Sequence, residues 1–274
     1  MTAFNWSDGA GFVTIRGQRL EAISRGPAPD RAPTIVMLHE GLGCAALWRD
    51  FPARVAAATG FGVFAYSRAG YGQSDPTPLP RPLNYMTREA RETLPELLEA
   101  IGFRRGVLLG HSDGASIAAI YAGSVEDFRV RALVLMAPHF FTEDSGLAAI
   151  ASAREAYASG DLRRRLGKYH SDVDNAFHGW CDAWLDPGFK SWNIADVIDY
   201  WRVPTLAIQG AGDQYGTLAQ IREIERRTYS PVDVEIFENC QHSPHLEQRE
   251  KTLAVIADFC ARLMRIEQAK VEIR

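Results

Sequence analysis

Ser112, at the centre of the segment Gly-His-Ser-Asp-Gly at 110–114, is the residue of this chain best placed for nucleophilic chemistry. The apolar run 105–109 before it predicts a buried strand, and the small-residue run 115–122 after it predicts a helix. Strand, sharp G-x-S-x-G turn and helix together are the context of a nucleophile elbow. The two glycines lack the Cβ atoms that would collide where strand and helix cross, so the turn can expose the serine hydroxyl. The alternative is a small-residue turn in an ordinary strand–helix unit, because the pentapeptide alone is a common chance match.

A serine nucleophile needs a base and an acid, and the chain supplies a candidate for each just past a predicted strand. His242 lies in the loop after strand 232–237, and Asp213 follows strand 205–209. Each of these residues, taken singly, could equally be a turn residue. Together with Ser112 they give the order Ser, Asp, His, which is the order of a Ser-His-Asp triad in sheets of this kind. His245 is an alternative base, and Glu143 and Asp144 are alternative acids.

The negative oxygen that develops during acyl transfer needs two N–H donors aimed at it. The N–H of Asp113, directly after the nucleophile, is one candidate. The other should come from the loop His-Glu-Gly-Leu-Gly at 39–43, where Gly41 is our choice and Leu42 the alternative. Glu40 stands beside this donor, and its side chain points either to solvent or into the site, where it could hold a substrate hydroxyl or amide.

The order of predicted elements is strand and helix in alternation, which indicates a mostly parallel, doubly wound α/β sheet. An antiparallel hairpin over 12–23 opens the chain, and unbroken apolar strands follow at 34–38, 62–66, 107–109 and 131–136. Helices are expected at 48–59, 86–100, 113–122, 217–227 and 248–267. Residues 1–138 and 203–274 are therefore expected to form one core.

One long interruption, 139–202, has no buried-strand signal and is rich in helix formers and aromatic residues. It leaves the sheet and returns between two strands, so we expect a helical cap over their carboxyl ends, where open α/β sheets bind ligands. Most of its aromatics should pack within the cap. As pocket candidates we name Trp180 and Trp184 from the cap, and Tyr215, Glu40 and Leu42 from the core loops.

Composition excludes several other classes of protein. A net charge of −4 provides no excess of positive charge for binding nucleic acid or an anionic membrane surface. No apolar run is long enough to span a bilayer, and the first residues lack the pattern of a signal peptide. Four scattered cysteines and seven histidines without ligand spacing predict neither a disulfide frame nor a metal site. We expect a cytoplasmic protein without cofactors whose partner is a small-molecule substrate, and a homodimer is left open.

With these residues in place, the chain resembles the helical-cap members of the α/β-hydrolase superfamily, from about residue 12 to 263. The segment Tyr-Ser-Arg-Ala-Gly-Tyr-Gly-Gln-Ser at 66–74 is similar to the turn after that family's fourth strand. The resemblance implies Ser112 as nucleophile, Asp213 as acid and His242 as base. It departs from the family at Glu40, where a glycine is usual, and this puts the second oxyanion donor in question. A serine at 112 also argues against the related dehalogenases and epoxide hydrolases, which use an aspartate nucleophile.

The expected reaction is attack of Ser112 on a carbonyl, with an acyl-enzyme that water then releases. A small, largely hydrophobic carboxylic ester or lactone is the leading substrate class. Hydrolysis of a carbon–carbon bond in a β-diketone or ring-cleavage product is the next alternative, followed by thioesters and amides. A hydrolase-like receptor that binds a ligand without turnover is the remaining one, although it would have no physical need for Asp213 and His242.

Overall fold

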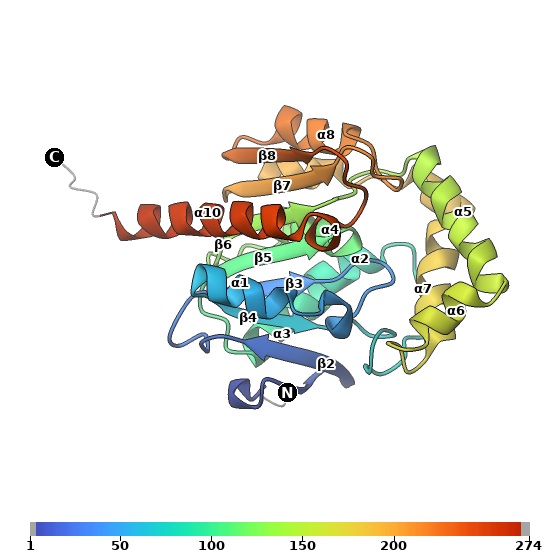
Figure 1. Cartoon of the computed structure of the whole chain (residues 1–274), viewed down its shortest axis with the longest axis horizontal. Helices are drawn as coiled ribbons and strands as arrows, with labels where there is room; N and C mark the ends of the chain where they lie inside the picture. The colour runs from blue at the N-terminus through green and yellow to red at the C-terminus, as the bar shows by residue number, and fades with distance from the viewer. Residues whose placement is uncertain (1–3, 270–274) are drawn as a thin grey trace.

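The computed structural model describes residues 4–269 and shows one eight-stranded sheet flanked by helices (Figure 1). The strand order is β1-β2-β4-β3-β5-β6-β7-β8, with β1 and β2 antiparallel and the rest parallel from β4 to β8. The strands are β1 (Ala10–Ile15), β2 (Gln18–Arg25), β3 (Thr34–Leu38), β4 (Gly62–Tyr66), β5 (Gly106–His111), β6 (Val130–Met136), β7 (Thr205–Gly210) and β8 (Val232–Phe237). The predicted fold class, a mostly parallel sheet with an opening hairpin, is confirmed.

Helices cover both faces of this sheet. They are α1 (Phe51–Thr59), α2 (Tyr85–Arg88), α3 (Leu94–Ala100), α4 (Asp113–Ser124), α5 (Asp144–Ala158), α6 (Asp161–Leu166), α7 (Val173–Trp184), α8 (Ala219–Arg227), α9 (Pro244–Glu247) and α10 (Arg249–Gln268). Short 3₁₀ or π turns are η1 (Trp6–Asp8), η2 (Ala45–Trp48), η3 (Glu89–Thr93), η4 (Pro187–Ser191) and η5 (Ala195–Tyr200). No helix in residues 4–269 has both the length and the apolar character needed to cross a membrane.

Two of the predicted helices differ from the observed ones for local reasons. The helix expected at 86–100 runs without a break from α2 to α3 but contains the π turn η3 just before Pro95, since a proline has no N–H to continue the regular backbone ladder. The helix expected from residue 48 begins only at Phe51, with Pro52 in its first turn.

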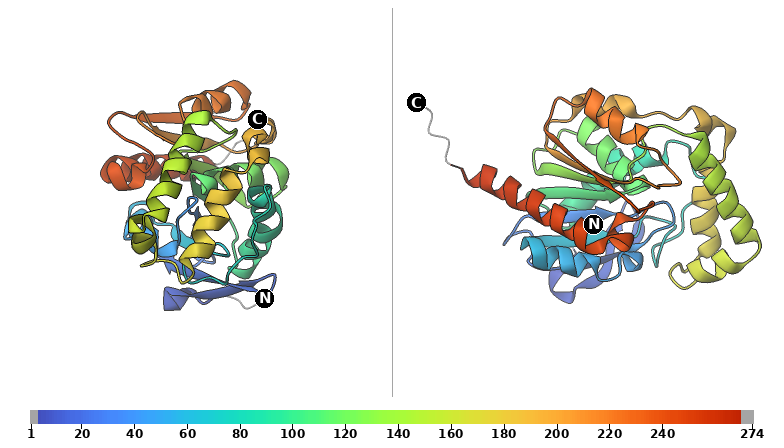
Figure 2. Two further views of the ribbon diagram at one scale, coloured as in Figure 1. Left: turned by 90° about the vertical axis from the view of Figure 1, so that its right-hand side faces the viewer. Right: turned by 45° about the horizontal axis from the view of Figure 1, so that its top comes forward.

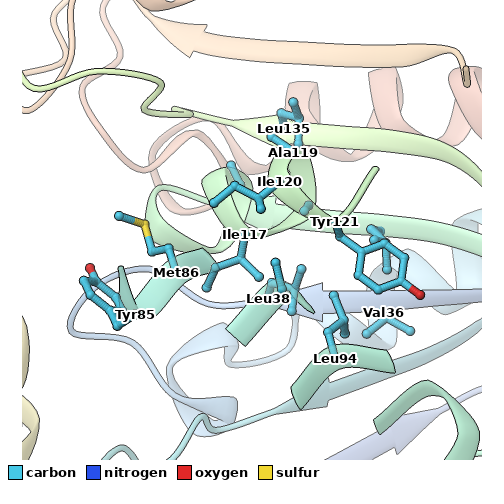
Figure 3. Packing of buried hydrophobic residues seen from close by; sticks show 14 of the residues in the cluster. Val36, Leu38, Tyr85, Met86, Leu94, Ile117, Ala119, Ile120, Tyr121 and Leu135 are labelled. Atoms are coloured by element: carbon cyan, nitrogen blue, oxygen red, sulfur yellow. The ribbon is translucent and has the colours of Figure 1, made fainter. Parts of the chain in front are cut away.

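The buried residues form a cluster on each face of the sheet. One is built on α1 and α10, and the other on α2, α3 and α4 together with parts of the segment 139–202. Figure 3 shows Ile117 and Ile120 of α4 packed among Leu38, Leu94 and Leu135, which come from β3, α3 and β6. Strands β3, β4 and β5 are buried along their whole length. This packing fixes the ends of the central strands, where the chemistry-bearing residues lie.

The segment between β6 and β7 is helical and holds α5, α6, α7, η4 and η5. Figure 1 shows α5, α6 and α7 beyond the end of the sheet to which the arrow of β5 points, and Figure 2 shows α5 and α7 side by side. These helices stand over the carboxyl ends of the parallel strands, on the same side as Ser112.

Candidate active site

Ser112 stands on a turn that only its neighbouring glycines permit. Its backbone has φ 54° and ψ −119° between β5 and α4, an uncommon conformation for a residue with a Cβ. A Cβ on Gly110 would lie 2.3 Å from the carbonyl oxygen of Gly114, and one on Gly114 would lie 2.0 Å from that of Leu38. The strain is therefore held by close contact of β5, α4 and β3.

Asp213 and His242 come together as the sequence predicts. His242 Nδ1 lies 2.9 Å from Asp213 Oδ1 and 2.8 Å from Oδ2. Asp213 also accepts hydrogen bonds from the N–H of Tyr215 at 2.8 Å and from Gln209 Nε2 at 2.8 Å. Burial raises the pKa of the Asp213 carboxyl, but the hydrogen bond and charge of His242 outweigh burial, so this pKa lies below its ordinary value. A carboxylate in this position holds the proton of His242 on Nδ1 and leaves Nε2 free to accept one.

The alternative residues lie elsewhere. The Asp144 side chain is 87% exposed and pairs with Lys190. Glu143 binds the hydroxyl and N–H of Thr217. His245 is buried at the start of α9, where burial holds its pKa well below the ordinary value of histidine.

The loop that carries His242 is fixed from two sides. Glu247 in α9 accepts hydrogen bonds from the N–H groups of Gln241 at 2.7 Å and Ser243 at 2.8 Å. His111 Nε2 lies 2.8 Å from the carbonyl oxygen of His242. Our sequence reasoning named neither role.

The oxyanion candidates face the same space. In the part of the chain that the structure describes, the N–H groups of Asp113, Gly41 and Leu42 donate to no other protein group, whereas that of Gly43 donates to the Glu40 carbonyl at 3.1 Å. The loop is held by Arg68, which donates to the carbonyl oxygens of His39 and, at 3.0 Å, of Glu40. Both Gly41 and Leu42 thus stay open as the second donor.

All predicted pocket residues line one small cavity of about 90 Å³. Its lining consists of Glu40, Gly41, Leu42, Ser112, Asp113, His139, Ile150, Trp180, Trp184, Tyr215 and His242. Trp180 of α7 lies directly on the loop 39–43, which we call the oxyanion loop. A Cβ on Gly41 of this loop would be 2.1 Å from Trp180 Nε1. The ring of Tyr215 packs against that of His242 at a centroid distance of 4.7 Å.

His139 is a further residue of the cavity that sequence reasoning missed. It follows β6 closely, just as Asp213 and His242 follow β7 and β8, so the same rule could have identified it. It is buried between His242 and Trp184, and burial lowers its pKa to about 3. The ring is therefore neutral at ordinary pH.

A second contact that sequence reasoning missed joins the helical segment 139–202 to the turn 110–114 around Ser112, which we call the nucleophile turn. Trp184 Nε1 donates to the Tyr85 hydroxyl at 3.0 Å, and this hydroxyl donates to Asp113 Oδ2. Burial raises the pKa of the Asp113 carboxyl. The side chain of Asp113, whose N–H is a candidate oxyanion donor, is thereby tied to the end of α7.

No group of three or more His, Cys, Asp or Glu side chains suited to a metal ion occurs within residues 4–269. The arrangement can instead supply a nucleophile, a base held by an acid, and free backbone donors. These are the parts of acyl transfer.

Several proteins of known structure share the fold described above. The chain aligns with a bacterial membrane phospholipase A at 20% identity and TM-score 0.76, covering 93% of this chain and 86% of that one. It aligns with the enol-lactonase from Burkholderia xenovorans LB400 at 18% and 0.71, covering 92% and 100%, and with naproxen esterase from Bacillus subtilis at 16% and 0.68, covering 91% and 90%. No curated protein sequence matches significantly. A profile described as the Alpha/beta hydrolase family matches residues 35–255, so the chain belongs to the alpha/beta hydrolase family.

Proposed function

We propose that this protein is a serine hydrolase that cleaves a small, largely hydrophobic carboxylic ester or lactone through an acyl-enzyme. One observation carries the proposal. Ser112, on its strained turn, and His242, bound to Asp213 at 2.8 Å, line the same cavity as the free N–H of Asp113. A nucleophile, a base and an oxyanion donor around one space are what acyl transfer requires.

The proposed reaction begins when His242 Nε2 takes the proton of Ser112 as the hydroxyl oxygen attacks the substrate carbonyl carbon. The resulting oxyanion binds the N–H of Asp113 and that of Gly41 or Leu42. Collapse of this intermediate breaks the ester C–O bond, and His242 gives its proton to the leaving alcohol. Water, deprotonated by His242, then attacks the acyl-enzyme. The C–O bond between the acyl group and Ser112 breaks, His242 returns the proton to the Ser112 oxygen, and the acid is released.

The cavity lining supports an apolar substrate of modest size. Leu42, Ile150, Trp180 and Trp184 contribute its apolar side chains, and its volume is about 90 Å³. Three of these come from the segment 139–202, so we assign this segment the role of a cap that sets substrate choice. Two of the compared structures are named as an enol-lactonase and an esterase, and these names support an ester or lactone as the substrate class.

A fluorophosphonate probe and an ester panel test the proposal. We expect stoichiometric labelling of the wild-type protein and of Ser124→Ala, a control on the same helix, and no labelling of Ser112→Ala. Among p-nitrophenyl esters, lactones and β-diketones, turnover should be fastest for small apolar or aromatic esters or lactones. Near wild-type turnover by Ser112→Ala contradicts the mechanism, and faster cleavage of a β-diketone than of any ester moves the assignment to carbon–carbon bond hydrolysis.

A further inference from the structure

Glu40 and His111 take no part in the proposed reaction, yet they stand among its loops. Glu40 lies at the start of the oxyanion loop after β3, and His111 is the last residue of β5, directly before Ser112. Glu40 Oε2 lies 3.5 Å from His111 Nδ1, and the two side chains are 28% and 1% exposed. This is the distance of an ion pair rather than of a hydrogen bond.

The other ring nitrogen of His111 fixes where one proton lies. Nε2 is 2.8 Å from the carbonyl oxygen of His242, and a carbonyl oxygen can only accept, so Nε2 carries a hydrogen. Among the described residues, Nδ1 has no hydrogen-bond partner. A neutral ring would therefore point the lone pair of Nδ1 at the Glu40 carboxylate. A second proton between the two groups removes that repulsion.

The surroundings favour an ionised Glu40 carboxyl, which leaves this proton for Nδ1 of His111. Burial raises the pKa of the Glu40 carboxyl, but its contact with His111 outweighs burial and holds this pKa well below its ordinary value. The other titratable groups that face His111 are the rings of His242 at 5.0 Å and His245 at 4.8 Å, with His139 farther away. Burial lowers the pKa of both His245 and His139, so neither carries a charge at neutral pH.

Gly43 supplies the space that this arrangement needs. A Cβ at position 43 would lie 2.4 Å from Glu40 Oε2 and 2.6 Å from Glu40 Cδ. The backbone of Gly43 is not in the left-handed region, so alanine fits there without backbone strain. An added methyl group would thus displace the flexible Glu40 carboxylate and leave the chain path unchanged.

We infer that Glu40 and His111 form a partly buried ion pair that positions the catalytic histidine loop and the oxyanion loop against the nucleophile turn. The pair joins three segments: the loop after β3, the end of β5, and the loop after β8. A charged donor holds the His242 carbonyl more firmly than a neutral one. The carboxylate also balances the positive charge of His111, which would otherwise oppose the imidazolium that forms on His242 during the reaction.

This role rests on the proposed function, because it acts through His242 and Ser112. Two variants perturb the pair differently: Glu40→Gln removes the charge, and Gly43→Ala moves the carboxylate. We expect each to lower kcat on the best ester by roughly 10- to 100-fold, the cost of misplaced catalytic groups, with KM within about twofold of wild type. The double variant should fall no further than the lower single variant, since both changes remove the same interaction. Glu238→Gln, a carboxylate lost from an exposed position in the His242 loop, is the matched control and should keep wild-type kcat.

Imidazole ¹⁵N shifts of His111 at pH 7.5 test the pair without any substrate. Both nitrogens should be protonated in the wild-type protein and in Ser112→Ala, and only Nε2 in Glu40→Gln. A neutral His111 ring in the wild-type protein overturns the ion pair even if Ser112 proves to be the nucleophile. Glu40→Gln with wild-type kcat, a change in KM alone, or additive effects of Glu40→Gln and Gly43→Ala would each overturn the positioning role. Failure of fluorophosphonate labelling with a charged His111 would instead contradict the proposed function.

Discussion

Replacing Asp213 by asparagine should place the proton of His242 on the wrong nitrogen. Asp213 Oδ1 accepts from the N–H groups of Tyr215 at 2.8 Å and Gly216 at 3.3 Å, while Oδ2 accepts from Gln209 Nε2. An asparagine satisfies the two backbone donors only with its oxygen on that side. Its NH₂ group then faces His242 Nδ1 and Gln209. Gln209 Nε2 also donates to the Gly216 carbonyl oxygen at 3.0 Å, so this orientation loses the one contact with Gln209, whereas the reverse orientation would lose both backbone donors.

With an amide donor against Nδ1, His242 carries its proton on Nε2 and cannot accept the proton of Ser112. The expected fall in kcat is about 10⁴-fold, the size measured for this change in a serine protease, which corresponds to about 5.4 kcal/mol of transition-state stabilisation. KM should change little, since Asp213 does not line the cavity. The assay is steady-state hydrolysis of the best p-nitrophenyl ester at pH 7.5, together with the rate of fluorophosphonate labelling. A loss of less than tenfold in a folded Asp213→Asn protein would refute this reasoning, and a collapse in Asp144→Asn would move the acid there.

Three other changes test the supporting structure. Gly114→Ala should destabilise the fold by at least about 3 kcal/mol, measured by urea unfolding, because its Cβ would lie 2.0 Å from the backbone oxygen of Leu38; an unchanged midpoint would contradict the tight elbow. Tyr85→Phe should cost about 1–3 kcal/mol, because it leaves Trp184 Nε1 and Asp113 Oδ2 buried without their partner; a melting temperature equal to that of wild type would show that neither group depends on this hydroxyl. His139 has a folded-state pKa of about 3, below the unfolded value of about 6.5, so the unfolded state binds the extra proton and stability falls as the pH drops below about 6.5. His139→Gln should reduce that slope by up to about 1.4 kcal/mol per pH unit between pH 6 and 4, and an identical slope would place the acid sensitivity elsewhere.

The sequence predicted the triad candidates because their positions depend on a local rule. Ser112, Asp213 and His242 each follow a strand with a readable apolar pattern. Parallel strands in one sheet end at the same edge, so residues just past those ends converge without any knowledge of side-chain contacts. The same rule would have found His139 after β6.

Contacts between side chains of distant segments were beyond the sequence pattern. Trp184 meets Tyr85 across 99 positions, and Tyr85 meets Asp113 across 28. No periodicity of the sequence relates such residues, and the sequence around each of them predicts only an ordinary core or turn residue. Glu40 was recognisable in the sequence as an unusual residue of its loop. The direction of its side chain depends on the missing side chain of Gly43 and on His111, and only the folded loops show both.

The atoms that would do chemistry come from strand ends, whereas the groups that restrain them come from other parts of the chain. Glu247 in α9 holds the N–H groups on both sides of His242, and Arg68 holds the carbonyls of the oxyanion loop. Trp184, at the end of the helical segment, reaches the nucleophile turn through Tyr85. This last restraint starts in the segment proposed as the cap, so a change of cavity-lining residues there should act on two properties at once: substrate choice and the position of the nucleophile turn. We expect substitutions at either tryptophan to act on more than substrate choice, because Trp180 lies against Gly41 of the candidate oxyanion loop and Trp184 is tied through Tyr85 to Asp113.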